Sequence, residues 1–321
     1  MTKGRNVGID ILKALLAFTV IFGHVLQIAI SDGDSSDVTW VVKNFIYSFH
    51  MPLFAFISGF FANAKLPIVD YTKQKFKQLI LPVFFWGIII AAYNVIVLGM
   101  GQLIVVKNFI IYDLWYLKSL FIILLISWPF FKYHSIIYCL LTLIFGFLCG
   151  GLFLFALLIP SFYLGCFIKK ILLKKSCLLI LFLSSVVVFV IELLFINPSM
   201  NVGDLNLLRT FEINGIINYF NRLLLALSAC ITFFVSFYYI NSLSFVGHRL
   251  SWLGNIGQQS LAIYAIQSLF VEKFGRLIIH EINILCYLLL SLLLFIFISF
   301  IIILAVRFID NKTTKTVLGI S

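Results

Sequence analysis

The chain has 321 residues, of which 63% are hydrophobic and only 11% charged, and its mean hydropathy is +1.14. This composition excludes a water-soluble domain, which would have to expose much of its apolar surface, so the lipid bilayer is the solvent. The net charge of +11 is spread over short segments between apolar runs. It therefore indicates anionic lipid headgroups as partners and argues against a nucleic-acid-binding domain.

A membrane-spanning helix needs about 20 apolar residues, so this length accommodates roughly ten spans and little else. We predict an all-α, polytopic transmembrane bundle of about ten helices. It would form a single integral-membrane domain over residues 1–321 with no fused soluble domain. The spans are expected at 8–30, 38–62, 79–99, 109–130, 135–149, 151–168, 176–196, 216–240, 257–273 and 284–307.

The distribution of basic residues predicts the orientation of the bundle. With the N-terminus inside, most of the 23 lysines and arginines fall in the cytoplasmic segments. The positive-inside rule then places both termini in the cytoplasm, as an even number of spans requires. We expect a multi-pass protein of the cell membrane, in bacteria the cytoplasmic membrane. The six cysteines lie singly in apolar runs without metal-ligand spacing, so we expect no metal site.

Three ionisable residues lie within the first predicted span. Lys13 and His24 are 11 residues apart, which returns to nearly the same helix face about 16 Å further along the axis. Asp10 lies one turn before Lys13, where the two charges are able to pair. Such groups are costly inside a bilayer and are functional candidates by default. The alternatives are that Asp10 starts the helix, Lys13 reaches the headgroups, and His24 bonds a neighbouring helix.

The second predicted span contains a second histidine, His50, directly before Met51 and Pro52. Proline lacks a backbone N–H and bends a helix, which frees a carbonyl. Ser58 and Gly59 follow two turns later and are small enough to allow close helix approach. Two facing helices, each with a histidine near a kink that would form a cavity, predict a functional site.

These motifs resemble those of the membrane acyltransferase family 3, especially its sugar O-acetyltransferase branch related to fucose 4-O-acetylases. The resemblance begins with Gly8, Asp10, Lys13, Gly23 and His24, and continues with Phe49–Phe54, Ser58 and Gly59. Weaker matches are Leu114–Leu117, Phe162–Gly165, Ile256–Gly257 and Ser260–Tyr264.

The sequence departs from the family pattern at two positions. Lys13 stands where the family usually has an arginine, so the charge is kept but the planar fork that grips a phosphate is lost. Gln267 stands where the late motif usually has a histidine, which argues against a required ionisable group there.

The resemblance implies an O-acyltransferase that moves an acetyl group from acetyl-CoA to a hydroxyl of a cell-surface or lipid-linked saccharide. Lys13, with Lys73, Lys75 and Lys77 of the predicted inner loop, would hold the anionic CoA. His24 would act as a general base or as a nucleophile that carries the acetyl group transiently, and the sequence leaves both roles open.

Further residues have predicted roles around the acceptor. His50 would orient it or act as a second acid or base. Trp115 and Tyr116 would stack on a sugar ring or the acyl arm, with an interfacial aromatic belt as the alternative. Arg222 would pair with an acidic sugar or a headgroup, and Asp10 and Ser58 would support the site.

Two other classes of function fit the composition. A secondary transporter or sugar-lipid flippase usually has broken helices in corresponding halves, and Met51–Pro52 has no obvious counterpart in the second half. A non-catalytic scaffold would leave His24 and His50 unexplained. A homo-oligomer is compatible with the sequence.

Overall fold

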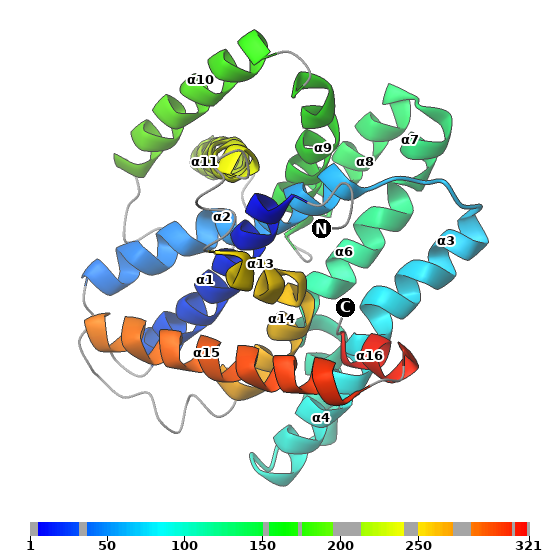
Figure 1. Ribbon diagram of the computed structural model, residues 1–321, viewed down its shortest axis with the longest axis vertical. Coiled ribbons are helices and arrows are strands. Elements are labelled where there is room, and N and C mark those ends of the chain that lie inside the picture. The colour runs from blue at the N-terminus through cyan, green and yellow to red at the C-terminus, as the bar shows by residue number, and fades with distance from the viewer. Residues whose placement is uncertain are drawn as a thin grey trace.

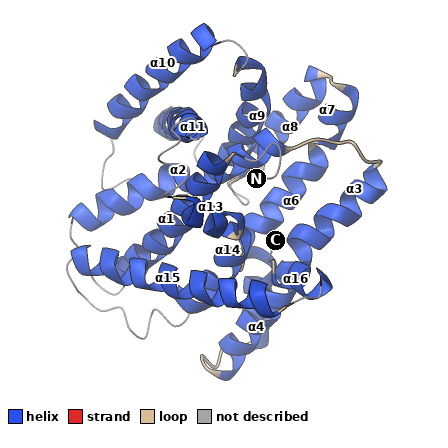
Figure 2. Cartoon of the chain, in the orientation of Figure 1, coloured by secondary structure: helices blue, strands red, loops and turns tan. Residues whose placement is uncertain are grey.

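The computed structural model is helical throughout the residues that it describes, and those residues contain no strand (Figures 1 and 2). Each predicted span falls mostly on helix in its described part, with the exceptions given below. The start of the predicted span 151–168 and the ends of those at 176–196 and 257–273 lie outside the described residues. The structure describes residues 6–31, 37–149, 154–172, 175–194, 213–240, 250–271, 284–309 and 312–319.

Two long helices, α1 (Val7–Ser31) and α2 (Asp37–Phe61), form the centre of the bundle (Figure 1). Most residues of α1 are buried, because α2, α11, α13, α14 and α15 all pack against it. A helix that is apolar and buried nearly all round belongs to the core of a bundle rather than to its lipid surface. Among the polar residues of α1, Asp10 is accordingly buried and Lys13 and His24 are half-buried, whereas Gln27 is exposed.

The third predicted span begins earlier than the sequence indicated. A continuous helix runs through α3 (Ile68–Lys75), the π-helical turn η1 (Phe76–Ile80) and α4 (Leu81–Ile96). The basic segment with Lys73, Lys75 and Lys77 is thus helical, not a loop. Its charges lowered the apolar signal, although a helix satisfies its own backbone groups whatever its side chains.

The fourth predicted span is divided in two. The helices α5 (Gln102–Lys107) and η2 (Asn108–Tyr112) end at Asp113, and α6 (Trp115–Ile126) with α7 (Trp128–Tyr133) follows. Leu114, between them, has the left-handed backbone angle φ of +51°. A non-glycine residue in this conformation is strained and marks a position held by its surroundings.

The remaining helices agree with the predicted order. The run from Ser135 forms two helices, as expected, and the span expected at 257–273 consists of two shorter helices. The bounds are α8 (Ile136–Leu148), α9 (Phe155–Ile171), α10 (Lys175–Leu194), α11 (Ile213–Ile240), α13 (Ser251–Gln258), α14 (Ser260–Leu269), α15 (Ile284–Phe308) and α16 (Lys312–Leu318).

Glycines set a close helix crossing between α2 and α9. A Cβ atom at Gly59 would lie 1.9 Å from the carbonyl oxygen of Phe162, and one at Gly165 would lie 2.0 Å from that of Phe56. The two backbones are in direct contact at this crossing. Small residues allow such approach between membrane helices, so the close contact predicted at Ser58 and Gly59 is present.

The helix α13 contacts the start of α1 in the same way. A Cβ atom at Gly257 would lie 1.7 Å from the carbonyl oxygen of Asp10. This contact holds the α13–α14 pair against the half of α1 that carries Lys13. It determines which residues of α14 face α1.

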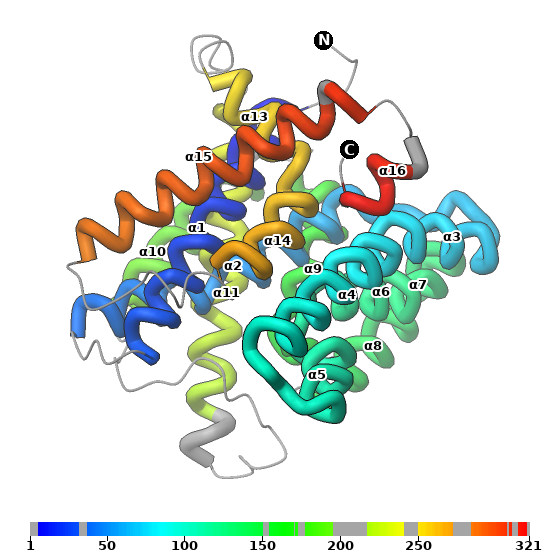
Figure 3. The backbone as a smooth tube through the Cα atoms, turned by 90° about the horizontal axis from the view of Figure 1, so that it is seen from below, coloured from blue at the N-terminus to red at the C-terminus, as the bar shows by residue number. Residues whose placement is uncertain are grey.

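Seven described helices are long and apolar enough to cross a membrane, and three shorter ones, α8, α9 and α14, fill further predicted spans. The outer helices expose apolar side chains such as Leu183, Leu293 and Phe300, which suits a lipid surface. The start of α1 and the helix α16 lie toward one edge of the bundle, and α5 lies toward the opposite edge (Figure 3).

Candidate active site

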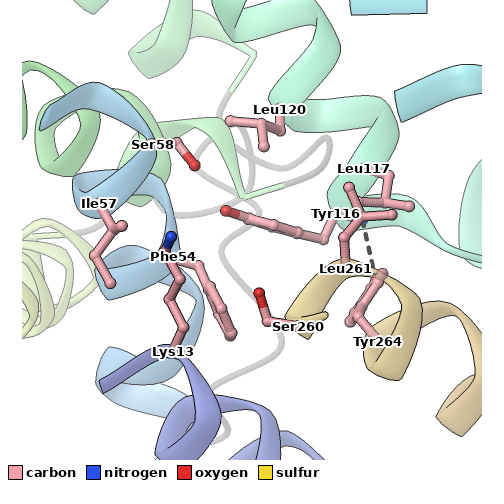
Figure 4. A pocket seen from close by; sticks show the side chains of 10 residues that line it. All are labelled: Lys13, Phe54, Ile57, Ser58, Tyr116, Leu117, Leu120, Ser260, Leu261 and Tyr264. Carbon is pink, nitrogen blue, oxygen red and sulfur yellow. Dashed lines mark hydrogen bonds between the residues drawn. The ribbon is translucent and has the colours of Figure 1, made fainter. Parts of the chain in front are cut away.

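Two groups of polar side chains lie between the central helices. The first lines a cavity of about 130 Å³ (Figure 4). This cavity lies among α1, α2, α6 and α14, whereas the second group surrounds the two histidines of α1 and α2. The cavity is lined by Lys13, Phe54, Ile57, Ser58, Tyr116, Leu117, Leu120, Ser260, Leu261 and Tyr264.

Lys13 is the cation of the cavity. Its Nζ atom lies 3.3 Å from Asp10 Oδ1, so the pair predicted from the sequence is present. The same Nζ atom lies 5.1 Å from the centroid of the Phe61 ring. The lysine is half-buried and Asp10 is buried. A half-buried ammonium with one carboxylate partner keeps further N–H donors for a ligand.

Tyr116 enters the cavity from the opposite side. Its hydroxyl points across the cavity toward Lys13 and Ser58 in Figure 4, and it is buried without a hydrogen-bond partner. The backbone N–H of Tyr116 donates to the hydroxyl of Tyr264 at 3.3 Å. That contact satisfies one of the unpaired amides at the start of α6 and connects α6 to α14.

The side chain of Lys118 stabilises the break between η2 and α6. Its ammonium donates to the carbonyl oxygens of Phe109 and Ile110, each at 2.9 Å. These carbonyls lie in η2, close to where the helix ends. The lysine therefore stabilises the break that aims Tyr116 at the cavity, and its place inside the membrane follows from this structural role.

The histidine group consists of His24, Gln27, Tyr47 and His50. The ring of Tyr47 contacts both imidazoles edge-on, with centroid distances of 6.2 Å to His24 and 5.1 Å to His50. Its hydroxyl lies 3.4 Å from His24 Nδ1 and donates a short hydrogen bond to Gln27 Oε1. A Cβ atom on Gly23 would lie 3.0 Å from this ring, so the glycine makes room for it.

The hydrogen bonds favour one tautomer for each imidazole. His50 Nδ1 lies 2.6 Å from the carbonyl oxygen of Ile46, which only accepts, so Nδ1 carries the proton. Tyr47 has one proton and donates it to Gln27, so its oxygen accepts from His24 Nδ1. In the neutral form of either ring the lone pair would then be on Nε2, the atom that a base or nucleophile would use.

The cavity group and the histidine group share faces of α1 and α2 but lie at different levels along these helices. Lys13 and His24 lie about 16 Å apart along α1, and neither histidine lines the cavity. Val20 and Met51 lie between the two groups along the chain and belong to the apolar cluster that contains Tyr116 and Tyr264. His24 is half-buried and His50 is buried.

The structure places the other predicted residues away from the cavity lining. Lys73 and Lys77 are exposed, and Lys75 donates to Gln78 at 3.1 Å. Trp115 is half-buried beside Tyr116, with ring centroids 6.1 Å apart. Arg222 is a buried cation on α11.

Four residues of these two groups had no role assigned from the sequence: Gln27, Tyr47, Ser260 and Tyr264. Ser260 and Tyr264 belong to a motif that was noticed, and their spacing of four residues places them on one helix face. Tyr47 precedes His50 by three residues, which is the same kind of signal. The described residues contain no cluster of His, Cys, Asp and Glu side chains that would hold a metal ion.

Comparisons with known proteins identify the family to which the chain belongs. A family model described as an acyltransferase domain, that of acyltransferase family 3, matches residues 6–306. Nodulation protein NolL of Mesorhizobium japonicum is 38% identical over 90 residues, and that of Sinorhizobium fredii 34% over 89 residues. Each match covers 26% of this chain and 24% of the relative, so the matched part spans about a quarter of these curated relatives. No solved structure matches the chain.

Proposed function

Because this chain belongs to acyltransferase family 3, we propose that it is a membrane O-acyltransferase that moves an acetyl group from acetyl-CoA to a hydroxyl of a cell-surface or lipid-linked saccharide. The observation that carries the proposal is the pair of imidazoles that both contact the ring of Tyr47. Hydrogen bonds at Nδ1 leave the lone pair of each ring on Nε2.

The cavity suits the acyl donor. Its walls combine apolar side chains with the ammonium of Lys13 and the hydroxyls of Ser58, Tyr116 and Ser260. A chain that carries amide groups, like the arm of CoA, requires this mixture of apolar contact and hydrogen bonding. Lys73, Lys75 and Lys77 would attract the CoA phosphates at the cytoplasmic surface, and the two exposed ammonium groups, Lys73 and Lys77, would act as mobile point charges.

His24 would act on the acceptor or on the acetyl group. As a general base, Nε2 takes the proton of the sugar hydroxyl while that oxygen attacks the thioester carbon, and the imidazolium then protonates the departing thiolate. As a nucleophile, the same lone pair attacks the thioester carbon and the C–S bond breaks, which releases the CoA thiolate and leaves an acetyl-imidazole. The sugar oxygen then attacks this acetyl group, the C–N bond breaks and returns its electron pair to Nε2, and the hydroxyl proton passes to the thiolate. Both routes need the tautomer that the contact with Tyr47 favours.

His50 and three further residues would hold the acceptor. His50 would orient the sugar hydroxyl or serve as a second acid or base through its own Nε2. Trp115 and Tyr116 present aromatic faces to a sugar ring or to the acyl arm. Arg222 would pair with an acidic sugar or a lipid headgroup, and the carboxylate of Asp10 would hold Lys13.

The decisive experiment is mass spectrometry of the surface polysaccharide in cells that carry wild-type protein, His24→Ala or His134→Asn. His134 is exposed and has a φ of +52°, a conformation that asparagine tolerates, so His134→Asn is the matched control. We expect the acetyl increment with wild type and with the control, and its loss with His24→Ala at equal membrane levels.

Acetylation by His24→Ala at the wild-type level would contradict the proposed role of this residue. A transporter or flippase would release no CoA from acetyl-CoA. Purified protein that moves the saccharide across the membrane without releasing CoA would therefore contradict the proposed acetyl transfer itself.

A further inference from the structure

Gln267 on α14 combines two unusual properties. Its side chain is fully buried, and neither Nε2 nor Oε1 has a hydrogen-bond partner. A buried amide without partners is costly, because its hydrogen bonds to water are lost and not replaced. An apolar side chain of the same size would pack there at lower cost, so the stability of the resting protein does not account for a glutamine.

The helix register places Gln267 between the cavity and the level of His24. Ser260 and Tyr264 line the cavity. Gln267 follows Ser260 by seven residues, which returns to nearly the same face about 10 Å further along α14. The direction of this segment follows from the glycine contacts before it, since Gly254 lies against Val7 and Gly257 against Asp10 and Ala14, so the chain runs along α1 toward His24.

The helix α1 packs against α14 and presents its own site residues in the same order. Lys13 lines the cavity at one end of the stripe, and His24 follows 11 residues later. An acyl donor whose arm occupied the cavity and whose thioester reached toward His24 would therefore pass the amide of Gln267.

On the premise of the acetyl transfer proposed above, we infer that the Nε2–H of Gln267 donates a hydrogen bond to the acetyl carbonyl oxygen as the transfer occurs. When the sugar oxygen forms its bond to the carbonyl carbon, the C=O π pair moves to this oxygen, which becomes negative. When the C=O bond re-forms, the C–S bond breaks and the thiolate leaves with the sulfur electron pair. The amide stabilises the negative oxygen between these two steps.

A primary amide is suited to this task. It donates without changing its protonation state, and in a dry site a fixed donor aimed at a developing charge acts most strongly on the transition state. Removing one such donor lowers kcat by roughly 100-fold to 1,000-fold in enzymes that transfer acyl groups. The loss falls on kcat rather than on the KM for the donor.

Asn94 on α4 offers a matched control. It is also fully buried, with both amide atoms unpartnered, and it does not line the cavity. The experiment compares wild type, Gln267→Met and Asn94→Leu as purified full-length protein, measuring thermal unfolding and the kinetics of CoA release from acetyl-CoA with the saccharide acceptor.

We expect both variants to be at least as stable as wild type, because each loses an unpaired buried amide. Only Gln267→Met should lose kcat, by roughly 100-fold or more, with the KM for acetyl-CoA within a few-fold of wild type. Gln267→His, which keeps a ring N–H donor, should recover part of kcat relative to Gln267→Met.

Full kcat in Gln267→Met, or a marked loss of its stability while Asn94→Leu is normal, would overturn the inference and leave the proposed function intact. A Gln267→His variant no better than Gln267→Met would also overturn it. If wild-type protein releases no CoA, the proposed function fails, and this inference fails with it.

Discussion

The side chain of Tyr47 connects the two histidines of the candidate site. It presents its ring to both imidazoles and its hydroxyl to His24 and Gln27. Lys43 lies on the same helix with its Nζ atom 5.7 Å from the centroid of this ring. In the proposed site Tyr47 orients His24 without touching the substrate. A substitution that removes only its hydroxyl would therefore change kcat by a small, measurable factor.

We predict that Tyr47→Phe lowers kcat about fivefold to tenfold. The variant keeps the ring contacts but removes a hydrogen bond of about 1 kcal/mol that orients His24. Steady-state kinetics of acetyl-CoA turnover would measure the loss. Tyr133→Phe, at an exposed position, is the control and should match wild type. Equal rates for both variants would remove Tyr47 from the proposed site.

Lys13 is the residue on which donor binding is expected to depend. We predict that Lys13→Met raises the KM for acetyl-CoA by roughly tenfold or more, because a charged hydrogen bond contributes about 1.5–3 kcal/mol. Lys13→Arg, which keeps the charge, should remain closer to wild type. Lys107→Met changes an exposed cation of α5 and should have no effect on KM. A Lys13→Met enzyme with normal KM would assign the cavity to another ligand.

At the scale of elements, the site depends on two backbone contacts that involve glycine. The crossing of α2 and α9 at Gly59 and Gly165 fixes α2, which carries His50 and Ser58. The contact of Gly257 with Asp10 fixes α13 and α14 against α1. Neither crossing has room for a methyl group without a shift of the backbone.

We predict that Gly59→Ala destabilises the protein by about 1–3 kcal/mol, the usual cost of overpacking a close-packed interior. The measurement is thermal unfolding in detergent. Gly101→Ala is the control, because Gly101 has open space around its Cβ position and a φ of −64°. A variant at Gly59 as stable as the control would mean that the crossing opens without cost.

At the scale of the whole molecule, the bundle brings the start of α1 and the C-terminal helix α16 toward one edge. Leu261 and Pro82 lie beside Gly319 just after α16, and Gly257 lies on Asp10. The cavity residue Ser260 is close to these contacts along the chain. The positive-inside rule predicts that this edge is the cytoplasmic one, from which the proposed donor would enter.

We predict that a reporter that folds only in the cytoplasm is active at either terminus and inactive when inserted between Gly99 and Gly101. The excess of lysine and arginine on one side of the bundle is the physical reason. Fluorescence of whole cells would measure it. Activity at the Gly99–Gly101 insertion and at neither terminus would invert the orientation and separate the cavity from its proposed donor.

Much of the fold could be predicted from the sequence, because a bilayer leaves the backbone few alternatives. Each long apolar run must satisfy its own N–H and C=O groups, so it forms a helix. The prediction was incomplete where polar residues interrupt a run. The helix starts at Ile68 despite its lysines, and the span near residue 113 breaks because Leu114 takes a left-handed conformation held by Lys118.

The sequence by itself determined the all-α membrane architecture, the family resemblance and the common face of Lys13 and His24, because hydropathy and the helical repeat are local properties. Only the tertiary structure decided that Lys13, Ser58, Tyr116 and Ser260 border one cavity, and that Tyr47 contacts both histidines. A helical repeat shows which face a residue occupies but not which helix packs against it. That pairing depends on glycine contacts and side-chain packing between segments far apart in the chain.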